Sequence, residues 1–329
     1  MRTIVAVLTL VVATAGDACT TFCTRGLFGR SYDFEIGYGM VMVNKRGVHK
    51  TSQTAQPAAW TSRFGNVTFN QYGRDSATGG MNEKGLVVEL MWLDGTQYPT
   101  ADARGELGAL EWIQYQLDTA SNVAEVIASD GKVRIAASGA PLHYLIADAS
   151  GDTAAIEFLG GKMVVHRGAN VLANDPYEDS LAAKKRGARD RFARASGGLS
   201  TATNVSGAFA LLDDVRQPHT QWQVVYDIRN RAIHWRTAVN RTPRGMKMSA
   251  FDFSCATPVQ VADVDSDRFR DYTRELNATL VRRSVRGTSF LKETSDAEID
   301  EAARWPERAT CVSVYPARRR GISGDTAGR

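Results

Sequence analysis

Hydrophobic and polar residues alternate along several stretches of the chain, and glycine occupies most of the breaks between them. Alternation of this kind predicts β-strands with one buried face. In the first third of the chain the pattern covers residues 20–25, 27–37, 40–47 and 77–93, the last as two strands joined by a tight turn at 82–85. It returns at residues 142–149, 153–160, 162–174 and 220–237, where the last stretch predicts a hairpin.

Apolar residues at helical spacing predict helices between these groups of strands. In residues 105–120, apolar side chains recur every three or four positions, at Leu107, Leu110, Ile113 and Leu117. Asn122 followed by Glu125 resembles a capping box, which predicts the start of the next helix.

The order of the elements differs from the strict strand–helix alternation of a doubly wound parallel sheet. Two more helices are predicted, at about 178–196 and 203–215. Strands, helices, strands, helices and strands then follow one another, which predicts an α+β fold of packed sheets with helices outside. No internal repeat or low-complexity linker divides the chain, so we expect one large domain over residues 19–318. The Gly- and Arg-rich residues 319–329 are expected to be a disordered tail.

The first 18 residues have the layout of a secretory signal peptide. Arg2 gives a positive start, residues 3–15 form an apolar run, and residues 16–18 are those expected before a cut site. The run is too short to span a bilayer comfortably, and no later segment is long and apolar enough to do so. The alternative is a buried first strand or helix. The leader interpretation predicts a periplasmic or secreted protein whose mature chain begins at Cys19 and has no membrane partner.

The composition argues against several kinds of partner. The chain of 329 residues is 43% hydrophobic and 23% charged, with a formal net charge of +4. Much of the basic excess lies in residues 317–321, and no basic stripe is interleaved with aromatic residues, so nucleic acid is not an expected partner. The five histidines show no metal-ligand spacing such as His-Glu-x-x-His. We therefore expect neither a metal nor a cofactor.

The chain has four cysteines: Cys19, Cys23, Cys255 and Cys311. An even number of cysteines in an oxidising compartment suggests pairing. A bridge between Cys255 and Cys311 is one option, which the sequence leaves open.

Cleavage after Ala18 would give Cys19 two useful groups on one residue. The thiol is a nucleophile once it is deprotonated. A free α-amine, with an ordinary pKa of about 7.7–8.0, can take the thiol proton and later protonate a leaving nitrogen, so no histidine is required. Cys23 is the alternative nucleophile, but a cut after Phe22 would place a bulky side chain where a signal peptidase needs a small one.

Two charged residues follow closely on Cys19. Arg30 would favour the thiolate electrostatically, and Asp33 would fix and polarise the α-ammonium group. The alternative for an arginine and an aspartate three positions apart is a surface ion pair.

Six segments, in the same order along the chain, resemble the choloylglycine hydrolase family. They are CTTF (19–22), FGRSYDFE (28–35), GGMNEKGLVVELMWL (79–93), VLANDPYEDSL (171–181), DRFARA (190–195) and TQWQVVYDIRNRAIHWRT (220–237). The family includes bile salt hydrolases and penicillin V acylases and belongs to the N-terminal-nucleophile hydrolase superfamily. The resemblance covers about residues 19–240. It implies a four-layer αββα sandwich and a homo-oligomer, a tetramer by analogy with the family.

The resemblance also implies catalytic roles for particular residues. Cys19 matches the nucleophile, and Arg30 with Asp33 matches the family's Arg-x-x-Asp pair. Asn174 matches the asparagine whose side chain helps to bind the tetrahedral oxyanion, a contact that contributes a few kcal/mol in a dry site. Taken by itself, Asn174 is a turn residue before Pro176.

A second set of residues would complete the site. Arg191 matches the family's distal arginine, and Arg194, one turn later, is the alternative. Trp92 stands where bile salt hydrolases of the Gram-positive type have an asparagine, as in the Gram-negative branch of penicillin V acylases, so backbone N–H groups would supply that oxyanion contact. Tyr32 and Phe34 are expected beside Trp92 as apolar substrate-binding walls, although aromatic residues in strands more often belong to the core.

These observations together predict an exported amidase that hydrolyses a linear amide bond of a small molecule through an acyl-enzyme. The acyl side is expected to be apolar or aromatic. The substrate candidates, in order, are a penicillin with an aryl side chain, a long-chain N-acyl homoserine lactone and a conjugated bile salt. The alternatives are a secreted binding protein without activity and a papain-like cysteine protease that uses a distant histidine.

Overall fold

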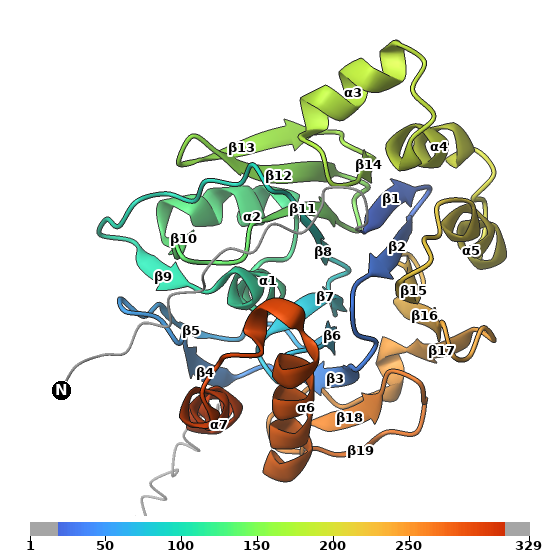
Figure 1. Cartoon of the computed structure of the whole chain (residues 1–329). Helices are drawn as coiled ribbons and strands as arrows, with labels where there is room; N and C mark the ends of the chain where they lie inside the picture. Colours follow the sequence, from blue (N-terminus) through green and yellow to red (C-terminus); the bar gives the residue numbers. More distant parts are fainter. Residues whose placement is uncertain (1–18, 313–329) are drawn as a thin grey trace, which may run out of the picture.

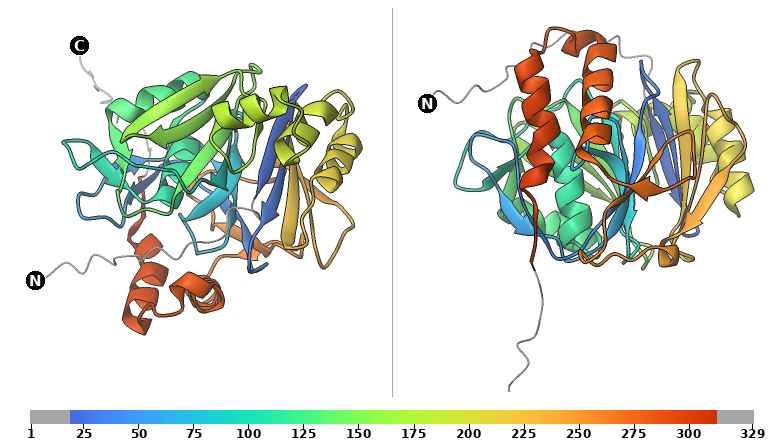
Figure 2. Two further views of the ribbon diagram at one scale, coloured as in Figure 1. Left: turned by 45° about the horizontal axis from the view of Figure 1, so that its top comes forward. Right: turned by 90° about the horizontal axis from the view of Figure 1, so that it is seen from below.

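Two β-sheets packed face to face form the centre of the protein, and helices cover their outer faces (Figures 1 and 2). The computed structural model describes residues 19–312. The expected leader, 1–18, and the expected tail, 319–329, lie outside the described residues. The layers confirm the α+β fold and the four-layer αββα sandwich.

One sheet has six antiparallel strands in the order β14–β1–β2–β15–β16–β17. Its strands are β1 (Thr20–Thr24), β2 (Leu27–Asp33), β14 (Val171–Leu172), β15 (Thr220–Asp227), β16 (Ala232–Thr237) and β17 (Arg244–Lys247). β15 and β16 form the expected hairpin. β2 is buried along its whole length because the second sheet covers one face and helices cover the other.

The other sheet has nine strands in the order β13–β12–β11–β8–β7–β6–β3–β18–β19. Its strands are β3 (Met40–Asn44), β6 (Asn66–Asn70), β7 (Ala77–Asn82), β8 (Val87–Trp92), β11 (Leu142–Ala147), β12 (Thr153–Leu159), β13 (Lys162–Arg167), β18 (Gln260–Asp263) and β19 (Arg270–Asp271). Two smaller sheets join β9 (Gly105–Leu107) to β10 (Val133–Ile135), and β4 (Val48–Thr51) to β5 (Ala59–Thr61) and β20 (Thr310–Cys311).

Three groups of helices complete the outer layers. α1 (Ala109–Thr119) and α2 (Val123–Ala128) pack on the nine-stranded sheet, and α3 (Tyr177–Lys185), α4 (Arg191–Gly198) and α5 (Val205–Asp214) pack on the six-stranded sheet. α6 (Arg274–Gly287) and α7 (Asp296–Arg304) form a C-terminal hairpin, and Leu280 of α6 packs against Met40 and Met42 of β3 (Figure 2). Among the described residues, no helix is long and apolar enough to cross a membrane.

Two of the helix predictions were too long. Residues 105–107 form strand β9, and α1 begins only after Gly108. The stretch 178–196 is two helices, α3 and α4, because Gly187 between them has a φ of +89° that a helix does not allow. The predicted helix start was correct, since the Asn122 side chain accepts a hydrogen bond from the Glu125 N–H, but the Glu125 carboxylate accepts from the N–H of Ser121 and does not complete a capping box with Asn122. The sequence had given no prediction for α6 and α7.

Cys255 and Cys311 form a disulfide, whereas Cys19 and Cys23 are free. The bond closes a loop of 56 positions in the sequence. It joins the segment before β18 to the short strand β20 at the end of the described chain.

Removing this disulfide should destabilise the protein. The double variant Cys255→Ser/Cys311→Ser should lose about 2–4 kcal/mol of unfolding free energy, because the bridge restricts the unfolded chain. Urea unfolding of the oxidised protein and of the variant measures the difference. Wild-type protein reduced with dithiothreitol is the control and should behave like the variant. Identical midpoints for oxidised and reduced wild type would show that the bridge does not form.

Candidate active site

Cys19 lies immediately before β1, beside the end of β2, and its side chain is only 4% exposed. Its sulfur is 3.6 Å from Nη2 of Arg30 and 3.9 Å from the carbonyl oxygen of Asp33. The structure therefore brings together the three residues at which the sequence predicted the reaction centre.

Arg30 extends from β2 across the layer between the sheets. Its Nη1 donates to the carbonyl of Thr78 at 3.0 Å, and its Nη2 donates to the carbonyl of Leu90 at 3.3 Å. The carboxylate of Glu89 on β8 is 2.5 Å from Nη1, with both side chains fully buried. The hydroxyl of Tyr226 donates to the other oxygen of Glu89 at 2.5 Å. Arg30 is thus fixed by β7 and β8 of the opposite sheet, and its Nη2, which donates to Leu90, also donates to the sulfur of Cys19.

The environment of the sulfur has opposing effects on its ionisation. Burial raises the pKa of the Cys19 thiol, while the Arg30 charge lowers it and the Asp33 charge raises it. Burial dominates, so the resting sulfur is held mainly as a neutral thiol. Burial also raises the pKa of Glu89 to about 7, against the lowering effects of Arg30 and of the Tyr226 hydrogen bond.

Asp33 lies on the opposite face of β2 from Arg30, because the two residues are three positions apart in a strand. Its Oδ1 accepts hydrogen bonds from Ser31 at 2.7 Å and from Thr220 at 2.5 Å. Its Oδ2 is buried and has no hydrogen-bond partner in the described part of the chain. The Arg-x-x-Asp spacing therefore places the cation on the sulfur side of Cys19 and the carboxylate on its main-chain side.

Arg191, at the start of α4, connects the main chain of Cys19 to Asn174. Its Nη1 donates to the carbonyl of Cys19 at 2.9 Å and to the Thr20 hydroxyl at 3.0 Å, and it lies 4.0 Å from Oδ2 of Asp33. Its Nη2 donates to Oδ1 of Asn174 at 3.0 Å.

The orientation of the Asn174 amide follows from its two partners. Arg191 can only donate, so it faces Oδ1, and the carbonyl of Trp92 can only accept, so it faces Nδ2 at 2.7 Å. One hydrogen of the Asn174 NH₂ group is used by Trp92, and the other has no acceptor within residues 19–312. Arg194 lies elsewhere, since it donates to the carbonyl of Asp214, so Arg191 is the arginine of this cluster.

Two buried residues that the sequence analysis did not select hold the backbone on both sides of Asn174. His143 on β11 lies 2.8 Å from the carbonyl of Ala173, through Nε2, and 3.1 Å from Oε1 of Glu157, through Nδ1. Glu157 on β12 accepts from the N–H of Tyr177 at 2.9 Å. Although burial acts to raise it, the pKa of Glu157 is lowered by its hydrogen bond with His143. The turn that carries Asn174 is therefore fixed at each end.

The three predicted aromatic residues occupy different environments. Tyr32 is buried in the core, where its ring stacks on Trp222 at 4.0 Å and lies 4.5 Å from the Arg30 guanidinium. Its ring therefore packs against Arg30 in the core and is not exposed to a ligand. Phe34 and Trp92 are both partly exposed and stand at the ends of β2 and β8, next to Asp33 and the Asn174 contact.

Cys23, the alternative nucleophile, lies inside β1 and lacks a comparable set of partners. Burial raises the pKa of its thiol to about 12, with a smaller contribution from Asp148. The contacts of Cys19 with Arg30 therefore favour Cys19.

Glu89 and the pair His143–Glu157 were missed because each stands in a strand that is otherwise apolar. That is also the signal that could have found them. A glutamate in the run VVELMW, or a histidine in LHYLIA, occupies a position that both sheets bury, and a buried charge requires a partner. The identity of that partner requires the fold.

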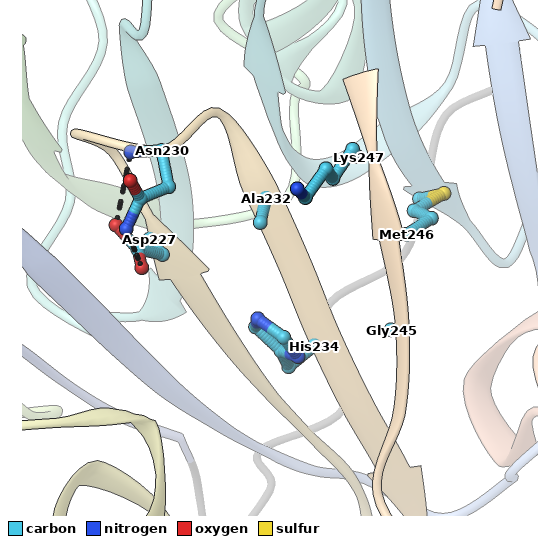
Figure 3. A pocket seen from close by; sticks show the side chains of 7 residues that line it. All are labelled: Asp227, Asn230, Ala232, His234, Gly245, Met246 and Lys247. Atoms are coloured by element: carbon cyan, nitrogen blue, oxygen red, sulfur yellow. Dashed lines mark hydrogen bonds between the residues drawn. The ribbon is translucent and has the colours of Figure 1, made fainter. Parts of the chain in front are cut away.

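A separate hollow of about 530 Å³ lies on the six-stranded sheet (Figure 3). It is lined by residues of β15, β16 and β17, including Asp227, His234 and Lys247. Asp227 pairs with Leu27, at the opposite end of β2 from Asp33, so the hollow is distant from Cys19. Within residues 19–312, no group of three or more His, Cys, Asp or Glu side chains is arranged to hold a metal ion.

Known proteins are similar to this chain in sequence. The family model of linear amide C–N hydrolases, choloylglycine hydrolase family, matches residues 19–183. A penicillin V acylase from Pectobacterium atrosepticum is 30% identical over 215 residues, which cover 54% of this chain and 56% of that protein. The match thus spans little more than half of the relative's length.

Solved structures share the fold. Penicillin V acylase from Agrobacterium tumefaciens has a TM-score of 0.68 at 24% identity, covering 78% of this chain and 98% of the other. A mutant conjugated bile acid hydrolase from Clostridium perfringens has a TM-score of 0.64 at 16% identity, covering 78% and 97%. With half of its residues matched by the family model, from Cys19 onward, the chain belongs to the choloylglycine hydrolase family of linear amide C–N hydrolases.

Proposed function

We propose that the protein is an exported amidase whose nucleophile is Cys19 and which becomes active when residues 1–18 are removed. In the uncut chain the nitrogen of Cys19 is a peptide nitrogen, which is no base. Cleavage after Ala18 converts it into an amine that can accept the thiol proton. The leader pattern of the first 18 residues supports the export step.

The observation that carries this proposal is the unpartnered oxygen of Asp33. Oδ2 is buried without a hydrogen-bond partner in the described chain, and an unpaired buried carboxylate oxygen is costly. Nη1 of Arg191 lies 2.9 Å from the carbonyl of Cys19 and 4.0 Å from this oxygen, so Oδ2 is near the main chain of Cys19. A free α-ammonium group at Cys19 would supply the donor that Oδ2 lacks.

The reaction follows from these positions. The α-amine takes the thiol proton, and the sulfur, favoured as a thiolate by Arg30, attacks the amide carbon. A C–S bond forms while the carbonyl electron pair moves to the oxygen. The second N–H of Asn174, together with backbone N–H groups, then stabilises this oxyanion.

Collapse of the tetrahedral intermediate breaks the C–N bond, and the α-ammonium group gives its proton to the leaving nitrogen. Water then attacks the thioester, and the same amine accepts a proton from it. The C–S bond then breaks, the acid is released and the α-ammonium group returns its proton to the sulfur, so one group serves as both base and acid.

The acyl group is proposed to be apolar or aromatic. Phe34, which follows Asp33, and Trp92, whose carbonyl accepts from Asn174, are both partly exposed, which supports an apolar wall on the acyl side. The names of the relatives, penicillin V acylase and conjugated bile acid hydrolase, support aryl penicillins and conjugated bile salts as substrate classes. A long-chain N-acyl homoserine lactone fits the same chemistry, and an aryl penicillin ranks first.

The free amine at Cys19 should be essential. A chain that begins at Cys19 should hydrolyse penicillin V or another member of the three amide classes, and the same chain with one extra N-terminal glycine should lose nearly all activity. Product formation is followed by chromatography, and mass spectrometry confirms each N-terminus. Cys19→Ala is the inactive control. Equal rates with and without the extra glycine would favour a papain-like mechanism instead, and a folded mature chain inert towards all three classes would favour the non-catalytic binding protein.

Removal of the Arg30 charge should raise the pKa of the Cys19 thiol. In the double variant Arg30→Met/Glu89→Gln, which leaves no unpaired buried charge, iodoacetamide should alkylate Cys19 at pH 7.5 several-fold more slowly than in wild type, because a higher thiol pKa leaves less thiolate. The whole rate profile should move to higher pH.

The labelling experiment needs two control variants. Glu89→Gln alone keeps the cation and should preserve or increase the rate, and Cys19→Ala shows whether Cys23 contributes to labelling. An unchanged pH profile in the double variant would remove Arg30 from the activation of the sulfur.

A further inference from the structure

A third aromatic residue reaches the site from the far end of the chain. Phe290 lies in the short 3₁₀ turn Ser289–Leu291 that follows α6. Its ring centroid is 6.5 Å from that of Phe34, with the planes at 87°, and 6.1 Å from that of Trp92, with the planes at 55°. These are the spacings of aromatic rings in contact.

The two partners of Phe290 lie at the ends of β2 and β8, the strands that carry Asp33 and the Asn174 contact. Phe34 directly follows Asp33, whose carbonyl oxygen is 3.9 Å from the sulfur of Cys19. Trp92 contributes the carbonyl that receives the Asn174 amide at 2.7 Å. A ring that contacts both residues therefore connects the β2 side of the site to the β8 side.

The three rings retain exposed surface, in contrast to the aromatic core beneath them. Phe34, Trp92 and Phe290 are all partly exposed, whereas Tyr32 and Trp222 are buried. The indole N–H of Trp92 is used by Asp94, at 2.5 Å. The cluster thus offers ring faces and edges and no hydrogen-bond donor of its own.

The turn that carries Phe290 is fastened to the segment that carries Phe34. The carboxylate of Glu35 accepts hydrogen bonds from the N–H of Ser289 at 2.9 Å and from its hydroxyl at 2.8 Å. The guanidinium of Arg283 on α6 lies 3.5 Å from the ring centroid of Tyr38. The segment after β2 is therefore held at two points, by the start of the 3₁₀ turn and by α6.

We propose that Phe290 determines acyl specificity, by forming with Phe34 and Trp92 a three-sided aromatic slot that selects acyl groups ending in a single aryl ring over straight alkyl chains. This inference rests on the proposed amidase function and names the residue that sets its substrate class. A flat ring can make edge or face contacts with all three side chains, whereas a flexible alkyl chain gains less per atom and loses rotational freedom. Phe290 lies outside residues 19–183, the range of the family match, so the slot depends on the C-terminal hairpin.

Matched anilides test the slot. Mature chains beginning at Cys19 are assayed on phenoxyacetyl and hexanoyl p-nitroanilides, which share one leaving group and differ only in the acyl part. Phe290→Ala should lower the ratio of kcat/KM for phenoxyacetyl over hexanoyl by about tenfold, mainly through KM, with kcat changed little because the reacting groups are intact. Glu35→Ala, which releases the turn, should shift the ratio in the same direction by a smaller factor.

The control variant removes an equivalent ring elsewhere. Phe269 is also partly exposed and pairs with Phe251 at 4.8 Å, next to β19. Phe269→Ala should leave the acyl ratio unchanged. An unchanged ratio in Phe290→Ala, in an enzyme that hydrolyses the anilides, would overturn the slot and leave the amidase function standing.

A binding experiment tests the slot in a variant that does not turn over substrate. In the mature Cys19→Ala background, calorimetry should show that Phe290→Ala weakens the binding of phenoxyacetate about tenfold and the binding of hexanoate much less. If the variant weakens the binding of both acids equally, or of neither, the proposed slot is contradicted. Absence of hydrolysis by the wild-type chain, with this difference in binding present, would contradict the amidase function alone.

Discussion

The buried guanidinium of Arg30 is the constraint on which the rest of the site depends. A cation between two apolar sheets is tolerated only when an opposite charge and hydrogen-bond acceptors compensate it, since loss of one partner of a buried pair costs about 3–5 kcal/mol. Here the partners are Glu89 and the carbonyls of Thr78 and Leu90, all on the opposite sheet. Because Arg30 itself belongs to β2, its contacts fix the two sheets relative to each other where the sulfur of Cys19 lies. A Cβ at Gly79 would lie 2.0 Å from the Glu89 carboxylate, so this position must remain without a side chain.

A second constraint fixes the other side of the nucleophile. Arg191 binds the carbonyl of Cys19 and Oδ1 of Asn174, and His143 with Glu157 holds the backbone on either side of Asn174. The Asn174 amide is thereby oriented by Arg191, and the backbone that carries it is held by His143 and Glu157. Such an arrangement avoids reorganisation when negative charge develops on a bound carbonyl. The polar groups of the site are therefore products of the strands β2, β8, β11 and β12 and of the start of α4, not of a single loop.

The sequence predicted the parts of this arrangement that depend on local pattern. Alternation predicted the hairpin of β15 and β16, and the small residues before Cys19, together with Arg30 and Asp33, pointed to the nucleophile. It did not predict that Arg30 and Asp33 address opposite sides of Cys19, although a spacing of three in a strand requires this. Glu89, His143 and Glu157 could be suspected only as charges in apolar strands. The position of Phe290 depends on tertiary packing, and the break of the 178–196 helix depends on the conformation of Gly187. Hydrophobic periodicity reports neither.

On the proposed mechanism, the opposing effects on the pKa of the Cys19 thiol explain why the sulfur needs a proton acceptor next to it. Burial raises the pKa of the thiol more than Arg30 lowers it, so a folded but uncut chain would hold a neutral sulfur beside an amide nitrogen that cannot take its proton. The Arg30 charge lowers the pKa of the Cys19 thiol, but not enough to offset the effect of burial. On the proposed mechanism, scission after Ala18 supplies the missing base and at the same time gives Oδ2 of Asp33 its donor. On this mechanism, folding and activation are separate events, and a single cleavage joins them.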